Sequence, residues 1–248
     1  MSNLFDLTGK SILVTGAASG IGRCVAVEAS KLGANIILVD LNEEGLSETI
    51  SMMSVGNHAI CRCDLTNSDD RTGLVGRIGT LDGIVNCAGV GMTLPFKFCT
   101  DKELGRIMNI NFFGPIYLVQ ELTKAKKINK NASIVYMASI DGTVTGHIGN
   151  SCYAASKGAL MGSVRTQALE FAGRGIRVNC VSPARVNTPL IRRDNISEEQ
   201  VEANKLEYPM KRYAEPIEIA GYIIYLLSDV STYTTGSNLV IDGGFTIN

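Results

Sequence analysis

The sequence predicts an α/β protein built on one doubly wound parallel sheet of seven strands, with helices on both faces. Short apolar runs rich in β-branched residues recur along the chain, and they lack the apolar–polar alternation of half-exposed strands. Helical patterns alternate with these runs, which is the order that βαβ units require. No linker, repeat or low-complexity tract divides the 248 residues. We therefore expect a single domain over residues 1–248.

Seven runs are expected to form the strands, and four longer segments the main helices. The strands are predicted at 11–14, 35–39, 59–63, 83–86, 133–137, 177–181 and 238–241. Apolar residues at 21, 25, 29 and 32 have helical spacing, so they predict a helix over 20–32. Further helices are expected at 102–127 (one helix or two), 151–172 and 216–227.

Composition and charge exclude several classes of protein. With 23 Lys and Arg against 24 Asp and Glu, the formal net charge is −1, which argues against a dedicated nucleic-acid binder. No apolar run reaches the roughly 18 residues of a membrane span, and the first residues lack the pattern of a signal peptide. The seven cysteines are scattered and no ligand pairs stand out, so we expect no metal site. A soluble protein of the reducing cytoplasm is the expectation.

A glycine cluster, T-G-A-A-S-G-I-G, occupies residues 15–22, directly after the first expected strand. Glycines allow the backbone to turn sharply and a diphosphate to approach the N-terminus of the next helix, where free N–H groups favour anions. The spacing G-x-x-x-G-x-G differs from the G-x-G-x-x-G dinucleotide fingerprint. Its position at the first strand–helix junction nevertheless indicates a phosphate-binding loop.

An aspartate at the end of the second strand indicates which dinucleotide would bind. Asp40 lies 18 residues beyond Gly22, where a carboxylate can accept both ribose hydroxyls and would repel a 2′-phosphate. Residues 17–19 and Leu41 carry no positive charge that would compensate such a phosphate. The sequence therefore favours NAD over NADP. The alternative is that Asp40 caps a helix or lies on the surface.

Two further positions suit a nucleotide that lies along the carboxyl ends of the strands. Asp64 follows the third strand, where an acid can meet the adenine amino group. The residues N-C-A-G at 86–89 follow the fourth strand, where small residues leave room for an adenosine ribose. Each position is equally explained by turn chemistry.

A tyrosine and a lysine four residues apart, Tyr153 and Lys157, lie on one face of an expected helix. A free phenol has a pKa of about 10, too high for a base at neutral pH. A neighbouring ammonium group favours the phenolate and lowers that pKa. Such a phenol can exchange a proton with a carbonyl or alcohol oxygen while hydride moves to or from a nicotinamide, a transfer worth ~10²–10⁴ in rate.

Two polar residues are placed to assist this chemistry. Ser139 follows the fifth strand, 14 residues before Tyr153, and its hydroxyl can hold a substrate oxygen. Asn111 lies within the segment 102–127, where its amide could bend the helix and hold a water that links Lys157 to solvent.

Together these residues resemble the short-chain dehydrogenase/reductase family, in the branch with a single Rossmann-like domain. The matching motifs are T-G-A-A-S-G-I-G at 15–22, N-C-A-G at 86–89, N-F-F-G at 111–114, Ser139, Y-A-A-S-K at 153–157, V-S-P-A-R-V-N-T-P at 181–189 and D-G-G at 242–244. They span nearly the whole chain in the family's order. The chain departs from the family at Cys87, where a second Asn is usual, and at Ala184, where glycine is usual.

The resemblance implies a role for each residue. Tyr153 would be the acid/base, Lys157 would lower its pKa and bind the nicotinamide ribose, Ser139 would orient the substrate, and Asn111 would maintain the proton relay. The implied cofactor contacts are Gly16, Ser19, Gly20, Ile21, Gly22, Asp40, Leu41, Asp64, Leu65, Asn86, Ala88, Gly89, Tyr153, Lys157, Pro183, Val186 and Thr188.

Three functions remain open at this point. The first is an NAD-linked dehydrogenase of a polyol, sugar, steroid or hydroxy acid. The second is a 3-oxoacyl-acyl-carrier-protein reductase, which usually takes NADPH. The third is a non-catalytic NAD-sensing regulator, against which the full set of catalytic residues argues.

The substrate pocket is expected to include Val90, Gly91, Met92, Ile140, Asp141, His147, Asn150 and a charged lid over 189–212, in which Arg192 and Arg193 could meet an anion. Cys152 adjoins Tyr153, so thiol reagents are expected to inhibit. The helices at 102–127 and 151–172 could form a homotetramer or homodimer, or simply pack on the sheet.

Overall fold

The computed structural model describes residues 3–191 and 197–248 and contains one parallel sheet of seven strands in the order β3-β2-β1-β4-β5-β6-β7. The strands are β1 (Ser11–Thr15), β2 (Asn35–Asp40), β3 (Ala59–Arg62), β4 (Leu81–Asn86), β5 (Ile128–Met137), β6 (Arg177–Pro183) and β7 (Asn238–Ile241). The chain builds outward from β1 to β3 and then crosses to the other side of β1 to form β4. The predicted fold class is confirmed.

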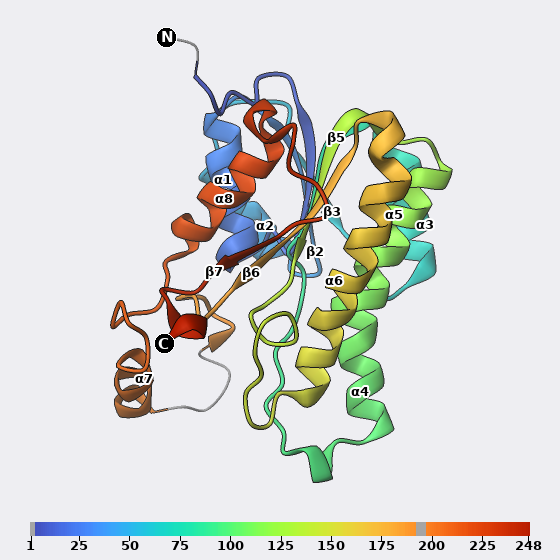
Figure 1. Cartoon of the computed structure of the whole chain (residues 1–248). Helices are drawn as coiled ribbons and strands as arrows, with labels where there is room; N and C mark the ends of the chain where they lie inside the picture. Colours follow the sequence, from blue (N-terminus) through green and yellow to red (C-terminus); the bar gives the residue numbers. More distant parts are fainter. Residues whose placement is uncertain (1–2, 192–196) are drawn as a thin grey trace.

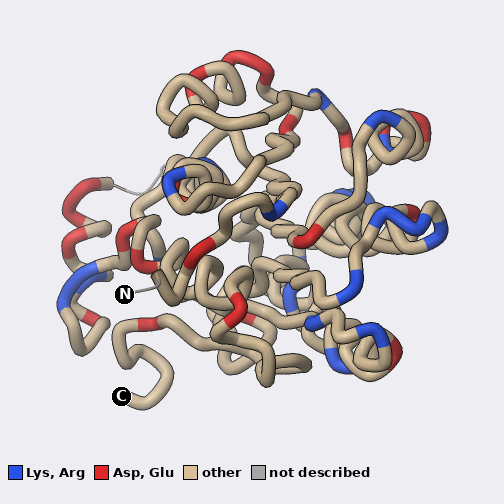
Figure 2. Tube along the Cα trace, turned by 90° about the horizontal axis from the view of Figure 1, so that it is seen from above, with Lys and Arg blue, Asp and Glu red and all other residues tan. Residues whose placement is uncertain are grey.

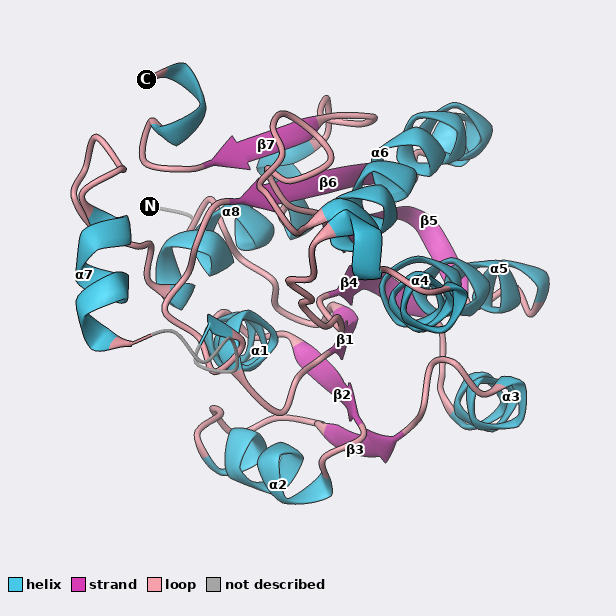
Figure 3. Ribbon diagram, turned by 90° about the horizontal axis from the view of Figure 1, so that it is seen from below, coloured by secondary structure: helices cyan, strands magenta, loops and turns pink. Residues whose placement is uncertain are grey.

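Helices cover both faces of the sheet (Figure 1). One face carries α1 (Gly20–Lys31), α2 (Glu43–Ser51) and α8 (Pro216–Leu227), and the other carries α3 (Ser68–Arg77), α4 (Asp101–Met108), α5 (Gly114–Lys124) and α6 (Ser151–Phe171). The view along the sheet in Figure 3 separates the two layers. The short helix α7 (Glu198–Lys205) lies outside both layers, on the side of the molecule where the chain ends.

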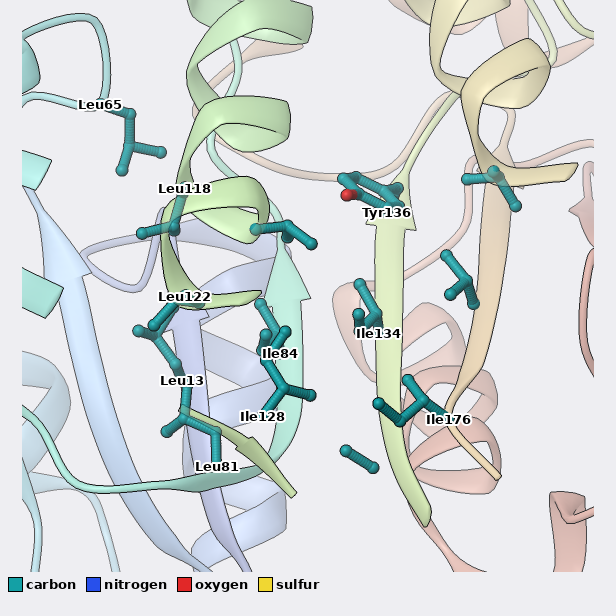
Figure 4. Packing of buried hydrophobic residues seen from close by; sticks show 14 of the residues in the cluster. Leu13, Leu65, Leu81, Ile84, Leu118, Leu122, Ile128, Ile134, Tyr136 and Ile176 are labelled. Carbon is teal, nitrogen blue, oxygen red and sulfur yellow. The ribbon is translucent and has the colours of Figure 1, made fainter. Parts of the chain in front are cut away.

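Two apolar cores, one on each face, stabilise this arrangement. Leu13 and Ile84 point into the core beneath α5 and α6, where they meet Leu118 (Figure 4). The next residue along β1, Val14, points to the opposite core and packs with Val25 of α1. Successive strand residues face opposite sides, so strands covered on both faces must be apolar at nearly every position. This explains the continuous apolar runs in the sequence.

The structure differs from the predicted elements where the sequence is polar. β5 begins at Ile128 rather than at residue 133, and its early part includes Asn131 in a left-handed conformation with φ 63°. The helices α2 and α3 are hydrophilic, and each begins after an asparagine, Asn42 or Asn67, whose side chain accepts backbone N–H groups of the first turn. Their apolar stripe is too short to stand out in the sequence, and α7 is missed for the same reason.

The expected segment 102–127 is α4 and α5 joined by a π-helical turn, Asn109–Phe113. The segment 151–172 is α6, closed by a 3₁₀ turn, Ala172–Arg174. Both pack on the sheet, one of the two alternatives that the sequence allowed.

Figure 2 shows that acidic and basic residues are interspersed along the described part of the chain. Among the described residues, no helix is both long enough and apolar enough to cross a bilayer. The same part of the chain holds no group of three or more His, Cys, Asp or Glu side chains that could bind a metal ion.

Candidate active site

A cavity of about 610 Å³ opens at the carboxyl edge of the sheet. Its walls come from the loops that follow β1 to β6. The strand order reverses between β1 and β4, so the loops after these two strands diverge and leave a crevice between them. The volume lies within the ~300–1,000 Å³ usual for small-molecule sites.

Nearly every predicted site residue lines this cavity. The lining includes Gly16, Ser19, Gly20, Ile21, Gly22, Asp40, Leu41, Asp64, Leu65, Ala88, Gly89, Ser139, Tyr153, Lys157, Pro183, Val186 and Thr188. The expected substrate-pocket residues Val90, Gly91, Met92, Ile140, Asp141, His147 and Asn150 line it as well. The predicted residues Asn86 and Asn111 are not part of the lining. Arg192 and Arg193 lie outside the described residues.

The glycine loop and the start of α1 form a cradle that suits a diphosphate. Ser19 caps α1 without a side-chain hydrogen bond, and the first turn contains no acidic residue, so the helix N-terminus is open to an anion. Gly16 has φ +69°, and a Cβ built on it would lie 2.8 Å from the nitrogen of Ala88. A Cβ on Gly22 would lie 2.2 Å from the oxygen of Gly16. The cradle therefore exists only with glycine at these positions, and it fits the dinucleotide that the sequence predicts.

Asp40 closes the same end of the cavity. Its carboxylate accepts the backbone N–H groups of Ala18 and Asn42, each at 3.1 Å. Two arginines are nearby, but neither lines the cavity. Arg23 donates hydrogen bonds to acceptors on α2 and to the carbonyl oxygen of Ala18. Arg62 lies opposite Asp40 in the backbone register of β2 and β3. The lining at this end thus offers a carboxylate and no cation.

Of the two further positions predicted to contact the nucleotide, Asp64 lines the cavity and Asn86 does not. Asp64 lines the cavity while its carboxylate accepts the N–H and the hydroxyl of Thr66 at 2.8 and 2.7 Å, so it also performs the turn chemistry. Asn86 is buried behind the lining, and neither polar atom of its side chain has a hydrogen-bond partner among the described residues. Only the residues that follow it, Cys87 to Gly89, reach the cavity.

Tyr153 and Lys157 lie one turn apart near the start of α6, as the spacing predicts. The Lys157 ammonium nitrogen is 5.7 Å from the centre of the Tyr153 ring. It also donates a hydrogen bond of 2.7 Å to the carbonyl of Met137, at the end of β5. Burial lowers the pKa of Lys157 to about 8. The lysine therefore brings its charge beside the phenol in a site with little competing solvent.

The loop after β5 brings Ser139 to the same cavity. Gly142 has φ +84°, and a Cβ on it would lie 2.0 Å from the oxygen of Ala154, so this loop packs directly on the backbone of α6. The Ser139 hydroxyl accepts the N–H of Asp141 at 3.2 Å, and the residue is 7% exposed. Close packing of loop and helix thus places Ser139 and Tyr153, 14 residues apart, on one cavity.

Asn111 occupies the π-helical turn between α4 and α5. Its amide oxygen accepts the N–H of Val90 at 2.9 Å, and its amide nitrogen donates to the carbonyl of Val90 and to the hydroxyl of Ser156. The Ser156 hydroxyl in turn donates to the carbonyl of Tyr153 at 2.7 Å. Asn111 therefore ties the loop after β4 to the turn that carries Tyr153. π-Helical turns often occur at functional sites for this kind of reason.

Sequence reasoning did not single out two of the lining residues, Thr15 and Arg185. The Thr15 hydroxyl accepts the N–H of Ala88 at 3.1 Å and joins two walls. Arg185 also lines the cavity, and so does Tyr208, which belongs to the segment 189–212 that was expected there. Arg185 is part of a quoted motif, but nothing in that motif indicates where its side chain lies.

Comparison with known proteins agrees with this geometry. Residues 16–246 match a family model described as "Enoyl-(Acyl carrier protein) reductase". The 3-oxoacyl-(acyl-carrier-protein) reductase FabG of Rickettsia bellii is 34% identical over 242 residues, which cover 97% of this chain and 98% of the relative. The chain belongs to the short-chain dehydrogenase/reductase family. As a member, it is an NAD(P)-dependent oxidoreductase that acts on CH–OH groups.

Other relatives of this dehydrogenase/reductase differ in their named substrates. A 2,5-dichloro-2,5-cyclohexadiene-1,4-diol dehydrogenase from Sphingobium indicum is 35% identical over 249 residues, covering 97% of this chain and 98% of the relative. A solved structure titled as a glucose/ribitol dehydrogenase from Brucella melitensis matches with a TM-score of 0.90 and 31% identity, over 98% of this chain and 99% of that one. Family membership thus establishes the reaction class and the fold, but not the substrate.

Proposed function

We propose that this protein transfers a hydride between NAD(H) and a secondary alcohol or ketone, with Tyr153 as the acid/base. The observation that carries the proposal is the joint placement of Tyr153, Lys157 and Ser139 on one cavity whose opposite end is closed by Asp40. The proposed substrate is a polyol, a sugar, a steroid or a hydroxy acid, the classes of secondary alcohol that suit an NAD-linked dehydrogenase.

Each group has a defined task in this reaction. The bound nicotinamide supplies or accepts the hydride. In the oxidative direction Tyr153 removes the hydroxyl proton of the substrate as the hydride leaves the carbon, and in reduction it returns that proton to the carbonyl oxygen. The Lys157 ammonium stabilises the phenolate form of Tyr153. The Ser139 hydroxyl donates a hydrogen bond to the substrate oxygen, on which charge develops.

The preference for NAD rests on the charges at the adenosine end. A carboxylate there accepts ribose hydroxyls and repels a 2′-phosphate, and the lining residues around Asp40 include no arginine or lysine. The second candidate is a 3-oxoacyl-acyl-carrier-protein reductase that uses NADPH, which the similarity to FabG proteins favours. A non-catalytic NAD-sensing regulator is the remote alternative.

We further propose a homotetramer or homodimer in the cytoplasm. The outer faces of α4, α5 and α6 expose Leu104, Tyr117 and Leu169, which supports assembly through these helices. All seven cysteines are free thiols, which supports a reducing compartment.

Parallel titration with NADH and NADPH, followed by cofactor fluorescence, tests the proposal. We expect NADH to bind at least ten times more tightly, a difference of about 1.4 kcal/mol. Tighter binding of NADPH would refute the argument from Asp40 and favour the 3-oxoacyl reductase. Binding of neither cofactor would contradict the proposed function altogether.

A further inference from the structure

The cavity carries a cluster of ionisable side chains beyond the residues assigned to catalysis and to the cofactor. Asp141 is 5% exposed, and both of its carboxylate oxygens are engaged. One oxygen accepts from Nδ1 of His147 at 2.5 Å, and the other accepts from the side-chain amide of Asn150 at 2.7 Å. The backbone N–H of Asp141 donates to the Ser139 hydroxyl. The cluster therefore belongs to the same loop after β5 that carries Ser139.

Asp141 and His147 are joined by a short hydrogen bond, and the pair is an ion pair when His147 is protonated. Burial opposes ionisation of Asp141, but hydrogen bonds from His147 and Asn150 hold its pKa below the usual value. The hydrogen bond to Asp141 raises the pKa of His147, while burial and the positive charge of Arg185 act against it and Glu207 acts with it. The His147 ring also stacks on Phe245, with 5.3 Å between centroids. The ring is thereby fixed in position at the cavity wall.

Arg185 adds a positive charge to the cavity wall beside this pair. It lines the same cavity from the loop after β6, and its charge reaches both Asp141 and His147. Within residues 3–191 and 197–248 no carboxylate lies within 4.0 Å of its guanidinium, which instead lies over the ring of Tyr213 at 6.0 Å. A guanidinium over a ring keeps its in-plane N–H donors for another acceptor.

We propose that the substrate carries a carboxylate, which Arg185 binds from the cavity wall with His147 beside it. The substrate is then a hydroxy acid, or in the reverse direction an oxo acid. This inference rests on the proposed function, because it takes Tyr153 and Ser139 as the groups that meet the reacting carbon. Bidentate pairing with carboxylates is a particular capability of arginine.

The same geometry argues against a polyol or a sugar. The Asp141 carboxylate already accepts two hydrogen bonds, whereas the Arg185 guanidinium offers charged donors, which suit an anion better than a neutral hydroxyl group. A steroid carries no anionic group that would pair with the Arg185 guanidinium on the cavity wall. A carboxylate satisfies Arg185 and leaves the Asp141–His147 pair intact.

The two histidines of the chain make this inference testable without turnover. His147 lies in the cavity, whereas His58 hydrogen-bonds to the backbone of Ile36 and Ser54 and does not line the cavity. Histidine-labelled, NAD-saturated protein is titrated with a series of short-chain carboxylates from acetate upward, and with the matching neutral amides, while both imidazole resonances are followed by NMR. We expect the carboxylates to shift His147 saturably, the amides to bind at least ten times more weakly, and His58 to stay unchanged.

Substitution separates Arg185 from the rest of the protein. Arg185→Gln is expected to weaken carboxylate binding at least tenfold, and Arg165→Gln, on the exposed face of α6, is expected to have no effect. Equal binding of acids and amides, or an unchanged response in Arg185→Gln, would overturn the inference, as would the absence of any carboxylate-induced shift. NADH titration of the same samples reports separately on the cofactor site, so failure of the proposed function would be recognised as such.

Discussion

Replacing Gly22 by alanine should have two opposing effects on the free energy of unfolding: a gain in helix propensity and a steric clash with the backbone of Gly16. Gly22 is the third residue of α1, and inside a helix alanine is favoured over glycine by about 1 kcal/mol. The new Cβ, however, would lie 2.2 Å from the oxygen and 2.7 Å from the carbonyl carbon of Gly16. Both are backbone atoms, so no side-chain rotation relieves the overlap, and α1 or the glycine loop must move.

The net change in the free energy of unfolding follows from the cost of the steric overlap and the gain in helix propensity. Overpacking typically costs about 1–3 kcal/mol, and a backbone neighbour places this site toward the upper end. We therefore expect Gly22→Ala to lower the free energy of unfolding by about 1–2 kcal/mol after the helix gain of about 1 kcal/mol is counted. Because the displaced loop also forms the diphosphate cradle, NADH affinity should fall at least tenfold.

Gly221→Ala is the matched control, since Gly221 lies inside α8 and a Cβ there would meet nothing within 4 Å. Urea unfolding should show this variant stabilised by about 0.5–1 kcal/mol, with NADH affinity unchanged. If Gly22→Ala were stabilised as much as Gly221→Ala, or bound NADH as the parent does, the packing argument for the cradle would be wrong.

Three further predictions concern single side chains. The pKa of Lys157 is about 8 in the fold against 10.5 when the residue is exposed, so between these pH values the folded protein binds fewer protons than the unfolded chain. The free energy of unfolding should therefore rise with pH in this range, relative to that of Lys157→Met. Urea unfolding of both proteins at several pH values tests this, and parallel pH dependences would contradict it. Asp40→Asn removes the charge but keeps acceptor capacity, so the NADH/NADPH affinity ratio should fall about tenfold, and an unchanged ratio would argue against the role of Asp40. Cys152 is buried, and burial together with a hydrogen bond from its thiol to Cys99 raises the pKa of that thiol, so it should react with iodoacetamide more slowly than the partly exposed Cys99. Peptide mass spectrometry that found the reverse order would contradict this.

The sequence predicted those parts of the fold that depend on local pattern. Strands buried on both faces must be apolar, so runs such as residues 35–39 are visible without a structure. The pairing of Tyr153 with Lys157 was equally accessible, because helical spacing places both residues on one face of a helix, and the family resemblance then implied their roles. Polar helices such as α2 were missed, since they are stabilised by a cap at Asn42 and by a few buried residues rather than by a long apolar stripe.

Contacts between distant segments could not be predicted from pattern. The hydrogen bond between His147 and Asp141 depends on a loop whose path is set by packing against α6, and the five residues between them carry no periodic signal. Nothing local shows that the Asn86 side chain turns away from the cavity while the next three residues line it. The position of Arg185 on the cavity wall, near Asp141 and His147, likewise depends on segments that only the fold brings together.

The central claim is that Tyr153 transfers the proton during hydride transfer. The most direct test is a single-turnover measurement of NAD reduction by Tyr153→Phe, using any alcohol that the parent enzyme oxidises, with NADH affinity measured on the same sample. The rate is expected to fall by ~10²–10⁴ while the variant still binds NADH. A variant that reduces NAD at the parent rate would contradict the account.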